Sequence, residues 1–188
     1  MNEKVLFEKC LAQASAVMAR VKPSQYDLPT PDTEWDVRTL VGHMLYELSW
    51  VADILNGKTI AEVGAAHDGD LIGDDLPTNW RVATDQAVSA VTQVDLSRPI
   101  HLSYGDFPAS HYLREQANDQ LIHAWDLGVA IGVPVLFDSA VAEILYQATL
   151  PRQRELAASG LFAPAIAVPD SADVQTKLLA LLGRRSSE

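Results

Sequence analysis

Apolar residues recur along most of this chain at three- and four-residue intervals, which is the spacing of amphipathic helices. The stretch 3–21 shows this pattern and stops before Pro23, a residue that cannot continue a helix. A second helix is predicted over 37–55, with Asp36 as its N-cap and Gly57 just beyond its end. Further helices are predicted over 79–94, 110–131, 139–159 and 171–182.

The segments between these helices are polar or rich in proline and glycine. The stretch 58–76 indicates a long loop, which is unusual inside a compact domain and often functional. Apolar and polar residues alternate within 97–109, so a short hairpin is predicted before the fourth helix. The long second and third connections favour a bundle of non-simple topology. We therefore predict an all-α four-helix bundle with this hairpin and an additional C-terminal helical segment.

Three residues are expected to shape the ends of the later helices. Thr78 is the expected N-cap of the third helix, and Asp138 that of the fifth. Pro151 interrupts the pattern of the fifth helix and should kink or split it. The segment 160–170 is rich in proline and is expected to be extended.

Composition narrows the class of protein. The 188 residues are 48% hydrophobic, which suits one domain over 1–188. With 25 acidic and 14 basic residues, the net charge of −11 argues against nucleic-acid binding and against a polybasic membrane surface. The N-terminus does not resemble a signal peptide, and no long apolar run is present, so a soluble cytoplasmic protein is expected. The single cysteine, Cys10, excludes an internal disulfide and is expected to be buried.

Two pairs of polar residues lie four positions apart on helix faces that otherwise look buried. His43 and Glu47 share the second predicted helix, and Asp119 and His123 share the fourth. Residues i and i+4 project on one face, so a carboxylate and an imidazole one turn apart can hold one cation. A third ligand, His43, is expected from the facing helix. Two imidazoles and one carboxylate suit zinc, nickel or ferrous iron, and three protein ligands leave positions open for water or substrate.

Other ligand-type residues are expected to have ordinary roles. His67, His101 and His111 are expected in loops or at the surface. Asp126 could orient the ligand helix, cap it, or pair with a neighbour such as Arg38. The tryptophans are expected to be core anchors: Trp35, Trp50, Trp80 and Trp125.

Three sequence motifs carry a resemblance. The second helix begins with WDVRTLVGH over 35–43, and the fourth contains an acidic residue, three residues, a histidine and then a Trp-Asp pair over 119–126. The third motif is the tail FAPAIAVPDSADVQTKLLALLGRR over 162–185. Together they resemble the DinB/YfiT-like metalloenzyme superfamily. More narrowly, they resemble the branch that includes the N-terminal domain of mycothiol-dependent maleylpyruvate isomerase.

The resemblance implies a DinB-like four-helix bundle that binds one divalent metal through His43, Asp119 and His123. The isomerase-like branch usually has glutamate at the position of Asp119. Aspartate is one methylene shorter, so its carboxylate is expected to reach the metal with a shift or through water. Glu47 would then supply the missing oxygen, act as a base, or bond to its buried neighbours. The isomerase also uses a C-terminal domain with a catalytic arginine, so a chain of 188 residues is not expected to be a maleylpyruvate isomerase.

The predicted function is that of a metal- and thiol-dependent transferase or isomerase. Zinc or nickel would be the cofactor, Glu47 the catalytic base, and mycothiol or bacillithiol the low-molecular-weight thiol that accompanies a small-molecule substrate. The alternative is a non-catalytic, stress-related protein that binds a metal or a small ligand. A third reading is a purely structural bundle that holds no metal. Surplus apolar helix surface would favour a homodimer.

Overall fold

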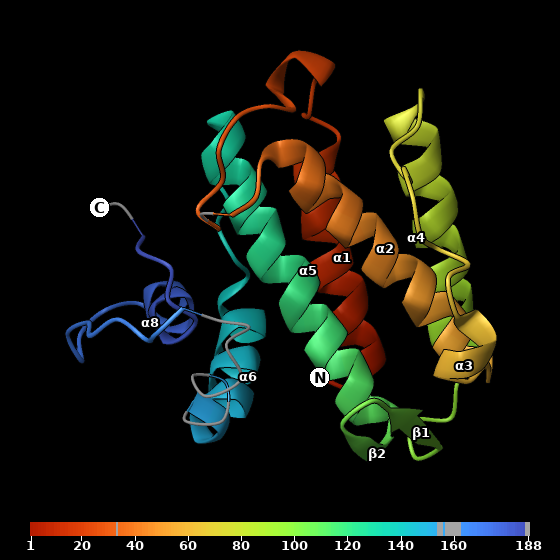
Figure 1. Ribbon diagram of the computed structural model, residues 1–188. Helices are drawn as coiled ribbons and strands as arrows, with labels where there is room; N and C mark the ends of the chain where they lie inside the picture. Colours follow the sequence, from red (N-terminus) through yellow and green to blue (C-terminus); the bar gives the residue numbers. More distant parts are fainter. Residues whose placement is uncertain (33, 154–155, 157–162, 187–188) are drawn as a thin grey trace. The chain divides into compact units, whose positions relative to one another are not determined.

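A computed structural model describes residues 1–32, 34–153, 156 and 163–186 (Figure 1). Contacts within the chain group it into two compact units, Met1–Val135 and Leu136–Glu188. Each unit is described by itself below. The expectation of a single domain over 1–188 stays a prediction.

Four long helices form the first unit, as the sequence predicted. Around the bundle, α1 packs on α5, α5 on α2, α2 on α4, and α4 on α1 (Figure 1). The predicted all-α four-helix bundle is therefore confirmed. The bounds of its helices are α1 Glu3–Met18, α2 Val37–Leu55, α4 Leu76–Gln93 and α5 Ala109–Ile131.

Contacts between side chains fix the direction of each helix pair. Glu3 and Arg114 form an ion pair near the first turns of α1 and α5, so these neighbours are parallel. Gln116 and Gln120 reach back to Glu47 and Met44 respectively, so α2 and α5 are antiparallel. Helices α1 and α2 lie on one diagonal of the bundle, and α4 and α5 lie on the other. The connection from α1 to α2 and the connection from α4 to α5 therefore each join diagonally opposite helices. The topology is thus not a simple up-and-down bundle.

The N-terminal cap of α2 is the predicted one. The Asp36 carboxylate accepts a hydrogen bond of 2.8 Å from the Thr39 N–H, and Gly57 follows the helix with a φ of +100°. Between α1 and α2 lies one short 3₁₀ helix, η1 (Pro23–Gln25). The cap of α2 fixes where the helix begins, and hence which face His43 occupies about two turns later.

The start of α4 was predicted wrongly. The helix begins at Leu76 rather than at residue 79, and its N-cap is Asp75, whose carboxylate accepts from the Thr78 N–H at 3.1 Å. Pro77 is compatible with this earlier start because the first turn of a helix leaves its N–H groups without partners inside the helix. The preceding loop also contains one short helix, α3 (Ile60–Val63), that the sequence analysis did not predict.

The predicted hairpin is present between α4 and α5. Strand β1 (Pro99–Leu102) pairs in antiparallel fashion with β2 (Gly105–Pro108). Ile100 and Leu102 of β1 are buried, as their alternation with polar residues predicted. The hairpin leads directly into α5.

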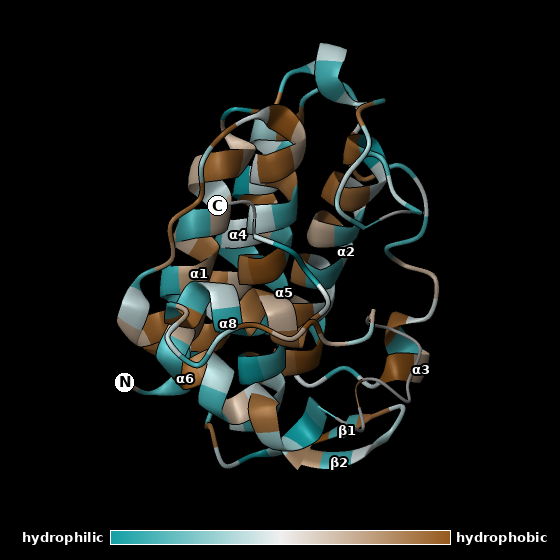
Figure 2. Cartoon of the chain, turned by 90° about the vertical axis from the view of Figure 1, so that its left-hand side faces the viewer, coloured by the Kyte–Doolittle hydropathy of each residue, from teal (hydrophilic) through white to brown (hydrophobic). Residues whose placement is uncertain are grey.

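The core of the first unit is mostly aliphatic, with a few aromatic side chains, and apolar and polar residues alternate in bands along the helices (Figure 2). The Cys10 side chain is fully buried in it, as expected. Among the largest fully buried side chains are Phe7, Leu40, Leu48, Leu113, Leu121 and Leu127. Because α2 and α5 pack against each other in this close-packed core, polar side chains on their facing surfaces have fixed positions.

The second unit contains α6 (Ser139–Thr149), a 3₁₀ turn η2 (Leu150–Arg152) and α8 (Val174–Leu181). Asp138 caps α6 as predicted, accepting from the Ala140 N–H at 2.9 Å. The α-helix ends at Thr149, just before Pro151, and half of the predicted remainder to 159, residues 154, 155 and 157–159, lies outside the described residues. The last helix begins at Val174, three residues later than predicted, because Asp173 is its N-cap. Within the described part of the chain, none of the helices is long and apolar enough to span a membrane.

Candidate metal centre

Two facing helices bring three predicted ligands together. His43 lies on α2, and Asp119 and His123 lie one turn apart on α5. One ligand atom from each residue falls in a cluster in which all the atoms lie within 4.8 Å of one another. The two imidazole rings meet edge to face, with centroids 4.9 Å apart and planes at 81°.

The Asp119 carboxylate lies between the two rings. Its Oδ1 is 3.4 Å from the Nε2 of His43 and 3.4 Å from the Nε2 of His123. Both distances exceed those of a good hydrogen bond. Its Oδ2 is buried and has no hydrogen-bond partner among the described residues. A buried carboxylate oxygen without a partner is costly, and a cation within this cluster would satisfy it. The residues present therefore fit a divalent metal.

Asp126 fixes the orientation of the His123 ring. Its carboxylate, which is fully buried, lies 3.1 Å from the Nδ1 of His123. With the proton of the neutral ring on Nδ1, the Nε2 atom keeps a free lone pair on the side of Asp119. This carboxylate–imidazole arrangement is how proteins commonly orient a metal-binding histidine. Of the roles that the sequence left open for Asp126, the structure supports that of orienting a ligand.

The electrostatics of the cluster favour positive charge. Burial disfavours the charged imidazolium of His123, but Asp119 and Asp126 on either side outweigh burial and raise its pKa to about 10. Burial likewise raises the pKa of Asp119, yet the adjacent His123 and His43 reverse this and lower it well below the ordinary value. A cation at this place, whether proton or metal, is stabilised by two carboxylates.

Trp35 covers one side of the cluster. It lies just before α2, and its ring centroid is 4.8 Å from that of His43 and 5.6 Å from that of His123. The sequence predicted Trp35 as a core anchor, but its ring lies beside the two imidazoles. The only available signal was its position inside the motif that leads to His43.

Glu47 lies one turn beyond His43 on α2, outside the three-ligand cluster. Its Oε2 accepts a hydrogen bond of 2.8 Å from the Nε2 of Gln116 on α5. Burial, and next the charge of Asp119, raise the pKa of Glu47 above its ordinary value despite this bond. A half-buried carboxylate with a raised pKa beside the His43–Asp119–His123 cluster is suited to accept and release a proton.

Comparison with known proteins shows the family to which the chain belongs. Residues 7–128 match the family model described as the mycothiol maleylpyruvate isomerase N-terminal domain. The chain belongs to this family. The matched span includes α2 and nearly all of α5, and so it includes His43, Glu47, Asp119, His123 and Asp126.

Relatives in this family include two uncharacterized proteins of Mycobacterium tuberculosis, one from each of two strains. Each is 28% identical to this chain over 138 residues, which cover 68% of this chain and 66% of the relative. The match thus spans just under two thirds of the length of these relatives.

Two solved structures share the fold of the family. One is a crystal structure of the mycothiol-dependent maleylpyruvate isomerase, with a TM-score of 0.64 and 15% identity, covering 84% of this chain and 71% of that one. The other is a histidine-to-alanine mutant of the mycothiol-dependent maleylpyruvate isomerase. It has a TM-score of 0.61 and 14% identity, covering 82% of this chain and 68% of that one. At such identities these matches show the fold alone.

The other three histidines of the chain lie outside the His43–Asp119–His123 cluster. His101 on β1 is exposed, as expected, with 71% of its side chain accessible. His67 is half-buried rather than exposed, because its Nε2 lies 2.9 Å from the Oδ2 of Asp53. His111 is also half-buried, since its ring stacks on Phe107 with centroids 4.4 Å apart.

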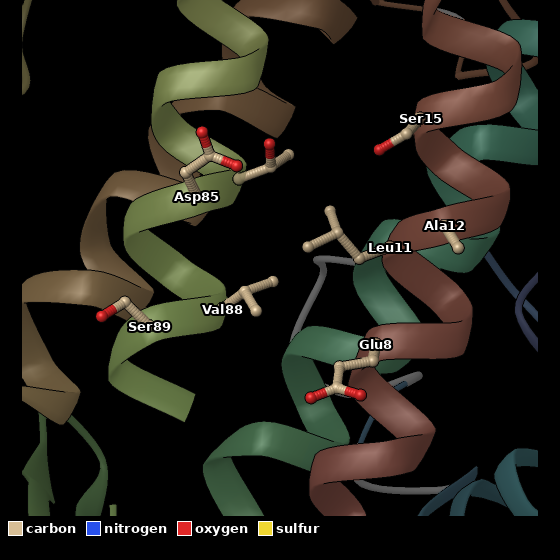
Figure 3. Close-up of a pocket in the computed structure, with 8 residues that line it drawn as sticks. Glu8, Leu11, Ala12, Ser15, Asp85, Val88 and Ser89 are labelled. Atoms are coloured by element: carbon tan, nitrogen blue, oxygen red, sulfur yellow. The ribbon is translucent and has the colours of Figure 1, made fainter. Parts of the chain in front are cut away.

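A groove of about 440 Å³ lies on another pair of helices, between α1 and α4 (Figure 3). It is open, and small, apolar and acidic side chains line it, none of them a histidine. It therefore lacks the ligand set of the metal cluster. Its lining residues are Glu8, Leu11, Ala12, Ser15, Thr84, Asp85, Val88 and Ser89.

Proposed function

We propose that this protein binds a divalent metal ion, zinc or nickel, through His43, Asp119 and His123, and uses it in a thiol-dependent transfer or isomerisation. The observation that carries the proposal is the convergence of two imidazoles on one carboxylate whose second oxygen is buried without a partner. Nitrogen and oxygen ligands in this number suit zinc and nickel and leave coordination positions for a substrate.

The residues around the cluster have distinct roles in this proposal. Asp126 holds the His123 ring with Nε2 toward the cluster, and Trp35 shields the imidazoles on one side. A divalent metal bound there supplies Lewis acidity, which lowers the pKa of a thiol or a water molecule. Asp119 offsets part of the positive charge. Glu47, one turn along α2, is the proposed catalytic base that takes up the proton released by the thiol.

The thiol is proposed from the family. Its name refers to mycothiol, and the two solved structures reported above are of the mycothiol-dependent maleylpyruvate isomerase and its mutant. A low-molecular-weight thiol of the mycothiol type is therefore the proposed co-substrate, with a small electrophile as the second substrate. The sulfur must come from such a molecule, since Cys10 is fully buried on α1. The homodimer and the cytoplasmic location stay predictions.

Elemental analysis tests the metal site directly. The protein is purified without chelators and without a metal-affinity tag, beside the variants His43→Ala and His123→Ala. His101→Ala is the matched control, since it removes an exposed histidine on the hairpin. We expect about one equivalent of metal in the wild type and the control, and its loss in both cluster variants. If both variants still contain one equivalent of metal, the assignment of His43 and His123 as metal ligands is wrong.

Turnover tests the chemistry. Wild type and Glu47→Gln are assayed with mycothiol and maleylpyruvate, and with mycothiol and a general electrophile such as 1-chloro-2,4-dinitrobenzene. We expect Glu47→Gln to lower the rate by about 100-fold or more while metal content stays unchanged, because a general base contributes 10² to 10⁴. Metal binding without any thiol-dependent rate in the wild type would instead favour a non-catalytic binding protein.

A further inference from the structure

Two glutamine amides are buried between α2 and α5, next to the metal cluster. Gln116 and Gln120 are 8% and 0% exposed. Each donates one hydrogen bond across the helix pair, Gln116 to the Glu47 carboxylate at 2.8 Å and Gln120 to the Met44 carbonyl at 3.3 Å. Within the described chain, the Oε1 atoms of both glutamines are buried without a hydrogen-bond partner. Only Gln116 contacts a group that can change its charge.

The bond between Gln116 and Glu47 suits a charged carboxylate. A carboxylate only accepts hydrogen bonds, so the amide must present its N–H to it, as it does here. Once Glu47 has taken up a proton, its new O–H group needs an acceptor in the same place. A half-turn of the Gln116 amide exchanges Nε2 for Oε1 at nearly the same positions, and Oε1 has no hydrogen bond to lose in that exchange.

We propose that Gln116 is the positioning residue for Glu47, and that its amide serves both protonation states of that carboxyl group. With Glu47 ionised, the Gln116 N–H donates to Oε2. With Glu47 protonated by the thiol, the amide turns and its Oε1 accepts from the carboxylic acid. This inference rests on the proposed role of Glu47 as base. Four other groups act on Glu47 or sense its charge: His43 on its own helix, and Asp119, His123 and Tyr112 on α5.

The chain offers a matched pair of variants. Gln116→Leu removes both the donor and the acceptor that face Glu47, at similar volume. Gln120→Leu removes an equally buried amide one turn along the same helix, and it bonds to backbone instead. Circular dichroism and cooperative thermal unfolding of the two variants establish that each is folded. A role of Gln116 in packing alone predicts the same behaviour for both.

The proton affinity of Glu47 is the decisive measurement. It is followed by carbon-13 NMR of labelled glutamate carboxyl groups, with Glu47→Gln to assign the signal. Because Gln116 stabilises the charged form, we expect Gln116→Leu to raise the pKa of Glu47 by about one unit, and Gln120→Leu to change it by less than about 0.3. An unchanged pKa in Gln116→Leu, or an equal rise in both variants, overturns the proposal.

Infrared spectroscopy tests the protonated state. A carboxylic acid whose O–H donates a hydrogen bond shows a lower carbonyl frequency than an unbonded one. Below the pKa of Glu47, we expect Gln116→Leu to move its band to higher frequency and Gln120→Leu to leave it in place; an unmoved band in Gln116→Leu refutes the turning amide. Both measurements are made with and without one equivalent of zinc. Absence of zinc binding would refute the metal site while leaving the link between Gln116 and Glu47 measurable.

Discussion

Asp119 is the residue whose surroundings most need a cation. One of its oxygens lies between two imidazoles, and the other is buried without a partner in the described structure. Leaving a buried polar atom unpaired costs about 1 to 3 kcal/mol, and more for a charged group. Natural proteins tolerate such a cost at functional sites rather than in ordinary cores. The unpartnered oxygen of Asp119 is thus the main support for the proposed metal site.

Asp126 should control metal affinity without touching the metal. Asp126→Asn keeps the shape of the side chain but removes the charge that orients His123. We expect zinc affinity to fall by about 10- to 100-fold, the usual effect of losing such a partner. Competition with a chromophoric chelator measures it. Asp106→Asn is the control, because Asp106 pairs with the exposed His101 at 2.7 Å, and it should leave the affinity unchanged. Equal affinity in Asp126→Asn would contradict the orienting role.

Spacing along one helix was enough to predict part of this site. Asp119 and His123 are separated by one helical turn, so their shared face follows from geometry alone. The contacts of Trp35 with the two imidazoles and of Gln116 with Glu47 depend instead on how α2 and the segment before it pack against α5. The periodicity of a single helix does not predict this packing. The role of Asp126 could be chosen only from its side-chain rotamer, which places the carboxylate beside the Nδ1 of His123. Sequence therefore predicted the three side chains that lie together, and tertiary packing determined which groups surround them.

At the scale of helices and loops, Asp75 should matter more than Thr78 for α4. The Asp75 side chain accepts from the Thr78 N–H, whereas the Thr78 side chain is exposed. Asp75→Ala should lower the urea midpoint of unfolding, since an N-cap is lost, and Thr78→Ala should leave it nearly unchanged. Equilibrium unfolding followed by circular dichroism distinguishes the two. A larger effect of Thr78→Ala would restore the cap that the sequence first indicated.

The loop after α2 is tied to that helix by a carboxylate. Asp53 accepts from Lys58 at 2.7 Å and pairs with His67 at 2.9 Å. Burial raises the pKa of Asp53, but these two bonds outweigh burial and lower it overall. Stability from this group is thus fully present above its unfolded pKa of about 3.9, and is lost as pH falls through the lower folded pKa.

Asp53→Asn tests this acid dependence. At pH 7 we expect the variant to lose about 0.5 to 1 kcal/mol of unfolding free energy, because Lys58 is half exposed and solvent screens its pair with Asp53. The difference from wild type should shrink as pH falls below about 4. Urea unfolding across this range measures it, with Asp74→Asn, an exposed loop substitution, as the control. A difference that stays constant down to pH 2 would contradict the assignment.

Helix existence was predictable here, and helix ends were less so. The bounds of α2 agree with prediction because Asp36 and Gly57 are unambiguous signals at its two ends. For α4, Thr78 was predicted as the cap, whereas the structure uses Asp75, three residues earlier. Both residue types favour an N-cap, so residue type alone does not identify the right one. The four-residue α3 is too short to show periodicity. Its only signal was Thr59 followed three residues later by Glu62, a capping box that the structure contains.

At the scale of the molecule, the net charge affects how cations approach the site, and the division into two units determines which part of the chain contains it. The chain carries a net charge of −11, which attracts cations to the protein as a whole. His43, Asp119 and His123 all belong to the first unit, Met1–Val135. The four tryptophans of the chain fall within the same unit. Tryptophan fluorescence therefore reports on the unit that would hold the metal.

Zinc should raise the thermal stability of this first unit. A ligand that binds the folded state only, at 100 times its dissociation constant, adds about 2.7 kcal/mol to the free energy of unfolding. For a unit of this size we expect the fluorescence-monitored Tm to rise by roughly 10 °C with zinc and to fall back with EDTA. His43→Ala/His123→Ala should show no such rise, whereas His101→Ala should respond like wild type. An equal rise in the double variant would mean that zinc acts outside the His43–Asp119–His123 cluster.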